Sequence, residues 1–147
     1  MSGDAGDPTD GVLGFDHLAL PMQNTTAMVD FYRSLGLSVE EHAAVVRVFM
    51  GDQMINFHLP DFWLGDFPLR APAARPPCGD LCLVWRGTEV SLAGLLDRAG
   101  AVVIEGPVAR EGGRRTVGSS VYVRDPDGNL LEFMTYPDQP KEHAHAR

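Results

Sequence analysis

The chain has 147 residues, 44% of them hydrophobic and 22% charged, which is typical of one globular domain. A formal net charge of -8 argues against nucleic acid and anionic membranes as partners, because both attract basic surfaces. No apolar run approaches the roughly 20 residues that cross a bilayer, and residues 1–11 lack the features of a secretory signal. We therefore expect a cytoplasmic protein.

The first half of the chain predicts a strand, a helix and three further strands. Residues 15–21 alternate in polarity, which is typical of a strand and places His17 on one of its faces. Apolar residues then recur at helical spacing over 26–35, and Gly36 ends the predicted helix. The three short strands are expected over 37–41, 45–50 and 54–59.

The same order of elements returns in the second half of the chain. An alternating strand is predicted over 80–85, and a helix over 89–99 ends at Gly100 as the first helix ends at Gly36. Three more strands are expected over 101–105, 119–124 and 129–136. The chain is therefore a repeat of two β-α-β-β-β units, and such units pack together because neither buries its apolar face alone.

This repeat sets the domain organisation that we expect. One domain spans 13–137, with its units at 14–59 and 80–136. The linker, 60–79, is rich in proline and is predicted to be irregular. Residues 1–12 and 138–147 are predicted to be disordered tails.

The most informative motif is the closing hairpin, Val-Tyr-Val-Arg-Asp-Pro-Asp-Gly-Asn-Leu-Leu-Glu-Phe at 121–133. Pro and Gly suit the tight turn between two strands, since Pro presets φ and Gly accepts a positive φ. Glu132 stands among apolar residues on the second strand. An ionised carboxylate in that position is costly unless it is paired or binds a metal.

The paired units, the opening Asp-His-Leu-Ala-Leu and this closing hairpin resemble the vicinal oxygen chelate superfamily, which includes glyoxalase I, extradiol dioxygenases and bleomycin-binding proteins. The resemblance covers 14–137 and is strongest to its glyoxalase-domain-containing "virulence-type" subgroup. It implies an α+β fold in which two βαβββ repeats form a cupped mixed sheet, and it implies a homodimer. It also implies a divalent metal ion inside the cup, namely Fe, Mn, Ni, Co or Zn.

The resemblance assigns ligand positions to the outer strands of each unit. His17 matches the first-strand position of unit one, and Glu132 matches the last-strand position of unit two. Asp80 and Asn56 hold the two other positions. Because amide oxygen is a poor ligand and His58 lies two residues further on the same face, we predict His17, His58 and Glu132 as metal ligands. Asp80 is either a fourth ligand or a group that orients a histidine.

Further residues are candidates for substrate contact or catalysis. A tyrosine at the offset of Tyr122 from Glu132 faces the metal in extradiol dioxygenases, although an aromatic residue on a strand needs no such role. We predict substrate contacts from Asn56, from Arg114 in a glycine-rich loop, and from Trp63 in the linker. A solvated basic loop is the alternative for Arg114. Packing against a partner subunit is the alternative for Trp63.

The resemblance implies a metal-dependent enzyme that chelates a small oxygenated metabolite. Lyase or isomerase chemistry of the glyoxalase type is favoured over ring-cleaving dioxygenation, because extradiol enzymes commonly carry two such domains. Glu132 or Asp80 would move the proton. The alternative is a non-catalytic drug-binding protein of the bleomycin-binding type, whose cationic ligand would suit the acidic charge.

Overall fold

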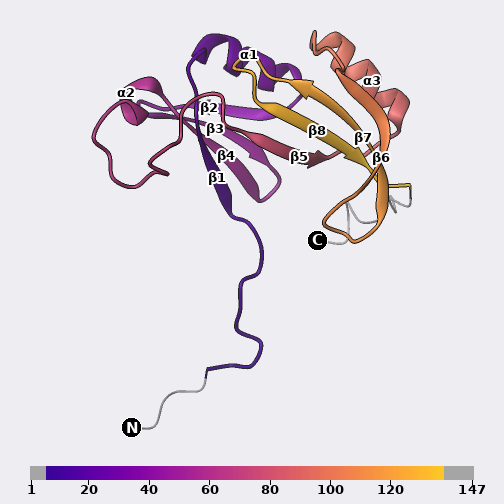
Figure 1. The fold of residues 1–147 in the computed structure, drawn as a ribbon, viewed down its shortest axis with the longest axis horizontal. Helices are drawn as coiled ribbons and strands as arrows, with labels where there is room; N and C mark the ends of the chain where they lie inside the picture. The colour runs from indigo at the N-terminus through magenta and orange to yellow at the C-terminus, as the bar shows by residue number, and fades with distance from the viewer. Residues whose placement is uncertain (1–5, 138–147) are drawn as a thin grey trace.

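A computed structural model describes residues 6–137 and shows the repeat directly (Figure 1). The second predicted tail, 138–147, lies outside the described residues. Unit one consists of β1 (His17–Pro21), α1 (Thr25–Ser34), β2 (Ser38–Glu41), β3 (Val45–Met50) and β4 (Gln53–His58). Unit two consists of β5 (Asp80–Val84), α3 (Glu89–Arg98), β6 (Glu105–Glu111), β7 (Val117–Arg124) and β8 (Leu130–Thr135).

Each unit forms its own four-stranded mixed sheet with the same topology. The strand order is β1-β4-β3-β2 in the first sheet and β5-β8-β7-β6 in the second. The first and last strands of each unit pair in parallel, and the other neighbours are antiparallel. The predicted α+β fold with two βαβββ repeats is therefore confirmed.

Two segments differ from the prediction. The linker is not wholly irregular, because it contains the short helix α2 (Pro60–Trp63). The strand expected over 101–105 instead begins at Glu105 and continues through Gly106 and Pro107. The pairing of β6 with β7 shifts register there, and this edge-strand irregularity accommodates a proline that cannot donate a ladder hydrogen bond.

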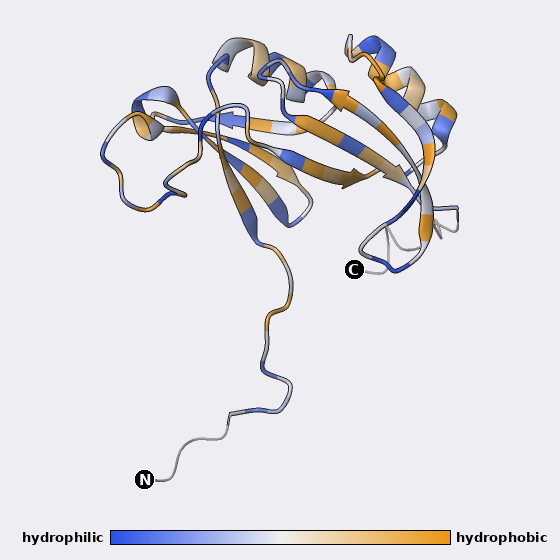
Figure 2. Ribbon diagram, viewed as in Figure 1, coloured by the Kyte–Doolittle hydropathy of each residue, from blue (hydrophilic) through white to orange (hydrophobic). Residues whose placement is uncertain are grey.

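The hydrophobic core lies between the helices and one face of each sheet. Both α1 and α3 lie on the same side of the sheets (Figure 1). The alternation of apolar and polar residues along the strands is visible in Figure 2. One buried cluster joins both units and includes Tyr32 from α1, Ile55 from the first sheet and Leu131 from the second. We call the face of each sheet that points away from the helices its open face.

The closing hairpin turn ties the second unit to the first helix. The Asp127 carboxylate accepts hydrogen bonds at 2.8 Å from the backbone N–H groups of Gln23 and Asn24. It accepts a third, also at 2.8 Å, from the Asn24 side-chain amide. A carboxylate at a helix N-terminus is further stabilised by the helix dipole. The Asp-Pro-Asp-Gly motif therefore has a structural role between the units.

Asp125 makes a second link beneath the same turn. Its buried carboxylate accepts the Tyr32 hydroxyl at 2.7 Å and the Asn129 side-chain amide at 2.8 Å. Burial, together with the Asp125 charge, raises the pKa of Tyr32, so this phenol stays protonated and donates. These contacts give the aspartates of the turn a structural role that requires no part in catalysis.

The chain before β1 extends away from the domain (Figure 1). It exposes apolar side chains, with Val12 at 97%, Leu13 at 103% and Phe15 at 80% exposure. Water-exposed apolar residues in a row are typical of a surface that packs against another molecule. Within the described residues, no helix is both long and apolar enough to span a membrane.

Candidate functional site

The open face of the second sheet is built around Glu132. Strand pairing places Glu132 opposite Cys82 of β5 on one side and opposite Tyr122 of β7 on the other. Cross-strand neighbours share a face, with Cβ atoms about 5 Å apart. The predicted catalytic pair, Glu132 and Tyr122, is therefore adjacent in this structure.

Hydrogen bonds fix the geometry around this carboxylate. The fully buried Ser120 donates its hydroxyl to Glu132 Oε2 at 2.5 Å. Arg110 Nε donates to the Tyr122 hydroxyl at 3.1 Å. The sequence reasoning missed Ser120, although its place two residues before Tyr122 on one strand face was a signal for it.

The pKa of the Cys82 thiol responds to burial and to the charge of Glu132 on this face. Burial raises its pKa, and the charge of Glu132 and a hydrogen bond with Glu132 raise it further, to about 12. Cys82 is therefore protonated at neutral pH and serves as a donor beside the carboxylate.

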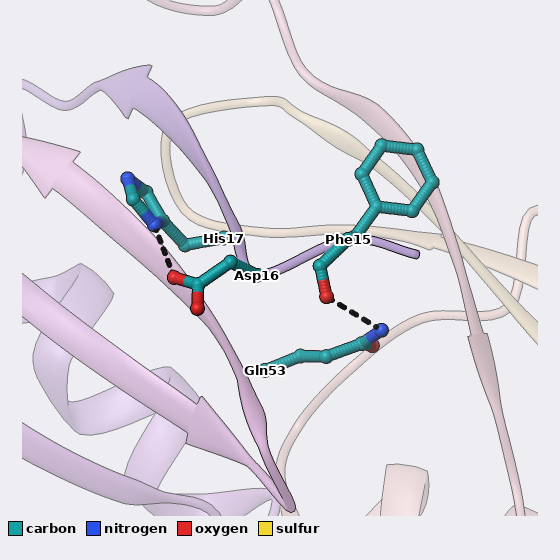
Figure 3. A network of polar contacts seen from close by, with 4 residues as sticks. All are labelled: Phe15, Asp16, His17 and Gln53. Atoms are coloured by element: carbon teal, nitrogen blue, oxygen red, sulfur yellow. Dashed lines mark hydrogen bonds and ion pairs between the residues drawn. The ribbon is translucent and has the colours of Figure 1, made fainter. Parts of the chain in front are cut away.

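On the first sheet, the ring of His17 is hydrogen-bonded to the carboxylate of Asp16. Its Nδ1 lies 2.7 Å from Asp16 Oδ1, as Figure 3 shows. When Nδ1 donates to a carboxylate, the neutral ring carries its lone pair on Nε2, the arrangement common in metal-binding histidines. The start of the strand is held by Gln53, which donates to the Phe15 carbonyl at 3.3 Å (Figure 3).

A cavity of about 920 Å³ lies between the two units and brings part of the predicted set together. His17 from β1 lines it together with Asp80 and Cys82 from β5. Most of its other walls are apolar, including Leu18, Met54, Leu81, Leu83, Trp85 and Phe133. Glu132 does not line the cavity itself and lies beside Cys82, which does.

The structure does not bring His58 to His17. Their strands pair in parallel, with His17 opposite Met54 and His58 opposite Pro21. The two imidazoles are therefore offset by four residues, or about 13 Å along the strand, whereas donor atoms that share an ion lie within about 4 Å. The combined assignment of His17 and His58 to one ion does not fit this register.

His58 has a different environment. Its ring packs against Phe62 with 4.2 Å between the centroids. Burial lowers the pKa of His58, and the nearby Arg70 guanidinium lowers it further. This imidazole is therefore neutral at physiological pH.

The three predicted substrate contacts have separate positions. Trp63 is buried, and its indole N–H donates to the Met22 carbonyl at 2.9 Å, so it packs inside the domain. The Arg114 guanidinium stacks over the Tyr136 ring at 4.6 Å. Asn56 lies on the open face of the first sheet, where its buried Oδ1 has no hydrogen-bond partner.

The chemistry of the predicted donors suits a divalent ion, because His17 is an oriented imidazole while Asp80 and Glu132 are carboxylates. However, no three His, Cys, Asp or Glu side chains of the described residues lie close enough in one chain to hold an ion.

Comparison with known proteins identifies the family. Models of protein families give no match. Glyoxalase domain-containing protein RDO1 of Mycosarcoma maydis is 34% identical over 86% of this chain and 70% of its own length. Virulence protein STM3117 of Salmonella typhimurium is 32% identical over 82% of this chain and 83% of its own length. The chain belongs to the glyoxalase domain-containing proteins.

Solved structures agree with this glyoxalase domain-containing family. The crystal structure of STM3117 superposes with a TM-score of 0.77 at 30% identity, over 86% of this chain and 99% of that one. A glyoxalase/bleomycin resistance protein/dioxygenase from Alicyclobacillus acidocaldarius, at 22% identity, shares the fold with a TM-score of 0.57 over 86% and 93%. The expected membership of the vicinal oxygen chelate superfamily is thereby confirmed.

Proposed function

We propose that this protein is a metal-dependent lyase or isomerase of the glyoxalase type, acting on a small metabolite with two neighbouring oxygens. The observation that carries the proposal is the cavity between the units, which His17 and Asp80 line from opposite sides. Its volume of about 920 Å³ falls in the range of small-molecule sites. Family membership supports the same class of chemistry.

In this proposal His17, Asp80 and Glu132, contributed by two copies of the chain, hold the divalent ion. The ion would supply Lewis-acid stabilisation of negative charge on a substrate oxygen. His58 is left out of the donor set because of its offset from His17 along the strands. The Asp16 carboxylate behind His17 supports the choice of Nε2 as the donor atom.

Glu132 is the residue that we propose to move the proton. Ser120 holds its Oε2, which leaves Oε1 to take a proton from substrate carbon and return it to the neighbouring carbon. Tyr122, held by Arg110, would hydrogen-bond a substrate oxygen. The Cys82 thiol stays protonated beside the carboxylate and so does not compete as a nucleophile.

We also propose that the working form is a homodimer in which the second copy completes the metal site. The described residues of one chain do not assemble three donors, and the apolar side chains of the segment before β1 are exposed to water. Light scattering coupled to size-exclusion chromatography would give the mass in solution, and a monomer would contradict this part.

The decisive experiment measures metal content and activity together. Untagged protein purified without chelators is analysed for divalent metals, alongside His17→Ala, Glu132→Gln and the exposed control His42→Ala. We expect the first two variants to lose metal and to lose turnover of a methylglyoxal–glutathione hemithioacetal by roughly a hundredfold or more. The control should keep both.

Two outcomes would overturn the proposal. The first is full metal content in both His17→Ala and Glu132→Gln. The second is wild-type protein that holds no metal and binds a cationic glycopeptide drug, which would favour the bleomycin-binding alternative. Catechol cleavage by the iron-loaded protein, in place of hemithioacetal turnover, would replace the isomerase assignment with dioxygenase chemistry.

A further inference from the structure

The open face of the first sheet carries a polar cluster that the proposed chemistry does not use. Arg47 of β3 pairs directly with Asn56 of β4. His58 lies two residues further along β4, so its side chain is on the same face. Met54, two residues before Asn56 and again on this face, lines the cavity between the units. The cluster therefore lies next to one wall of that cavity along β4.

Two neighbouring side chains of this cluster lack hydrogen-bond partners. Arg47 Nε and Asn56 Oδ1 are two of the three buried side-chain nitrogen and oxygen atoms without a partner in the described residues. Buried polar atoms in folded proteins are nearly always satisfied, so an unpaired donor beside an unpaired acceptor points to a missing ligand. Both side chains are half-buried overall, so part of each is exposed.

The cluster also carries positive charge, and no carboxylate of residues 6–137 lies within ion-pair distance of Arg47 or Arg70. Arg70 lies near His58, and its guanidinium contacts only the carbonyls of Ala71 and Ala74 at 3.5 and 3.4 Å among described groups. Neither Arg47 nor Arg70 forms an ion pair in the described part of the chain. Glu40, the cross-strand neighbour of Arg47, is instead bonded to His42 at 3.0 Å.

An aromatic wall borders the cluster. Phe62 of α2 packs on the His58 ring and also contacts Phe67, with 4.4 Å between the Phe62 and Phe67 centroids. This wall lowers the local polarity, which strengthens electrostatic attraction to a bound ion. A guanidinium fork in such surroundings recognises a carboxylate through two parallel hydrogen bonds.

We propose that Arg47, Asn56 and His58 form a recognition subsite for a small organic carboxylate that carries a hydroxyl group on the adjacent carbon. Arg47 binds the carboxylate, and the hydroxyl donates to Asn56 Oδ1. His58 closes the site as a neutral ring packed on Phe62. This inference deepens the proposed function and rests on it in one respect, namely that the carboxylate subsite anchors a substrate whose reacting carbons reach the cavity.

The test measures binding directly and needs no turnover. Lactate is titrated into the full-length protein in the presence of a chelator, and backbone amide shifts are followed by NMR. So small a ligand should bind with a Kd on the order of millimolar. Lactamide lacks the charge and propionate lacks the hydroxyl, and we expect each to bind at least tenfold more weakly than lactate.

Variants locate the binding site. Arg47→Met and Asn56→Asp should each weaken lactate binding tenfold or more, the second because it places a carboxylate against the ligand. Arg47→Lys, which keeps the charge and loses the fork, should fall between wild type and Arg47→Met. Arg98→Met on α3 is the matched control, since it removes an exposed charge of the same kind. Dispersed amide spectra show that each variant is folded.

Several results would overturn the subsite. These are no detectable lactate binding, binding that Arg47→Met and Arg47→Lys leave unchanged, or binding of inorganic phosphate in place of lactate. Loss of binding in Glu132→Gln to the same extent would move the carboxylate to the other sheet and would also overturn it. If the hemithioacetal and metal experiments fail while lactate binding keeps the expected variant pattern, the subsite stands and only the proposed reaction falls.

Discussion

The two units share one backbone topology but carry different polar side chains at the centre of their open faces. In the first sheet, Arg47 and Asn56 stand side by side, and Arg70 lowers the pKa of His58. In the second sheet, the corresponding strands carry Glu132, which contributes to raising the pKa of Cys82. In our proposals, the repeat therefore builds two halves of a site from one fold, one that holds an anion and one that accepts a proton.

The helices of the two units differ in the same way. The N-terminus of α3 is closed locally, because Thr88 Oγ1 accepts from the Ser91 N–H and Ser91 Oγ accepts from the Thr88 N–H, both at 3.0 Å. The N-terminus of α1 has no such side-chain cap. Asp127 of the other unit supplies the acceptor there instead. The cap of α3 therefore comes from residues of the same helix, whereas the cap of α1 depends on the packing of the two units.

The largest expected loss of stability comes from removing Asp127, which caps α1 from the other unit. Asp127→Ala breaks three hydrogen bonds to a charged acceptor and should lower the free energy of unfolding by about 3 kcal/mol. Thr88→Ala breaks the local cap of α3 and should cost about 1 kcal/mol. Urea unfolding followed by circular dichroism measures both.

The isosteric variant Asp127→Asn sharpens this comparison. It keeps one acceptor oxygen and removes the charge, so its loss of stability should lie between wild type and Asp127→Ala. A cost of Asp127→Ala equal to or below that of Thr88→Ala would show that the two units do not depend on this turn.

The second prediction tests the acidic face through Cys82. In a Cys78→Ser background, Cys82 should react slowly with iodoacetamide, because its pKa of about 12 leaves almost no thiolate at neutral pH. Glu132→Gln removes the negative charge and weakens the hydrogen bond with Cys82, and both of these favour the thiol over the thiolate. The effect of burial remains. We expect alkylation to become roughly tenfold faster, which corresponds to a pKa lower by about one unit.

Intact-mass spectrometry over time gives this rate. Glu111→Gln, which removes an exposed carboxylate at the end of β6, is the control and should leave the rate as it is. An equal rate in Glu132→Gln and its parent would mean that Glu132 does not act on the thiol, and the picture of an acidic second face would then be wrong.

Much of the fold follows from local patterns in the sequence. The helices over 26–35 and 89–99 agree with α1 and α3 within one or two residues, because apolar spacing and a following glycine are local signals. The strand β6 was misplaced because Gly106-Pro107 reads as a break, whereas an edge strand tolerates it. That tolerance depends on neighbouring strands, which sequence spacing does not encode.

The site was less predictable than the fold, for a reason that His17 and His58 illustrate. Alternation along a strand says which face a residue occupies, and it placed Asn56 and His58 on one face. It does not give the register between two strands, which separates the imidazoles by four residues. The position of Trp63 could not be predicted either, since nothing in the proline-rich linker indicates that α2 turns this side chain into the domain.

The smallest expected effect tests the positive charge of the first face through His58. Its folded pKa is lowered from 6.5 by burial first and by Arg70 second. The unfolded chain therefore takes up a proton before the folded protein does, so stability falls as pH drops from about 6.5 to the folded pKa and is level below it.

His58→Gln should be less sensitive to pH than wild type across this window. Arg70→Met should lie between them, because it removes the smaller of the two causes that lower the pKa of His58. Urea midpoints from about pH 8 to pH 5 measure the difference, with Arg98→Met as the control. Parallel curves for wild type and His58→Gln would show that the ring titrates freely, which would leave the first face without the buried, cation-flanked character that separates it from the second.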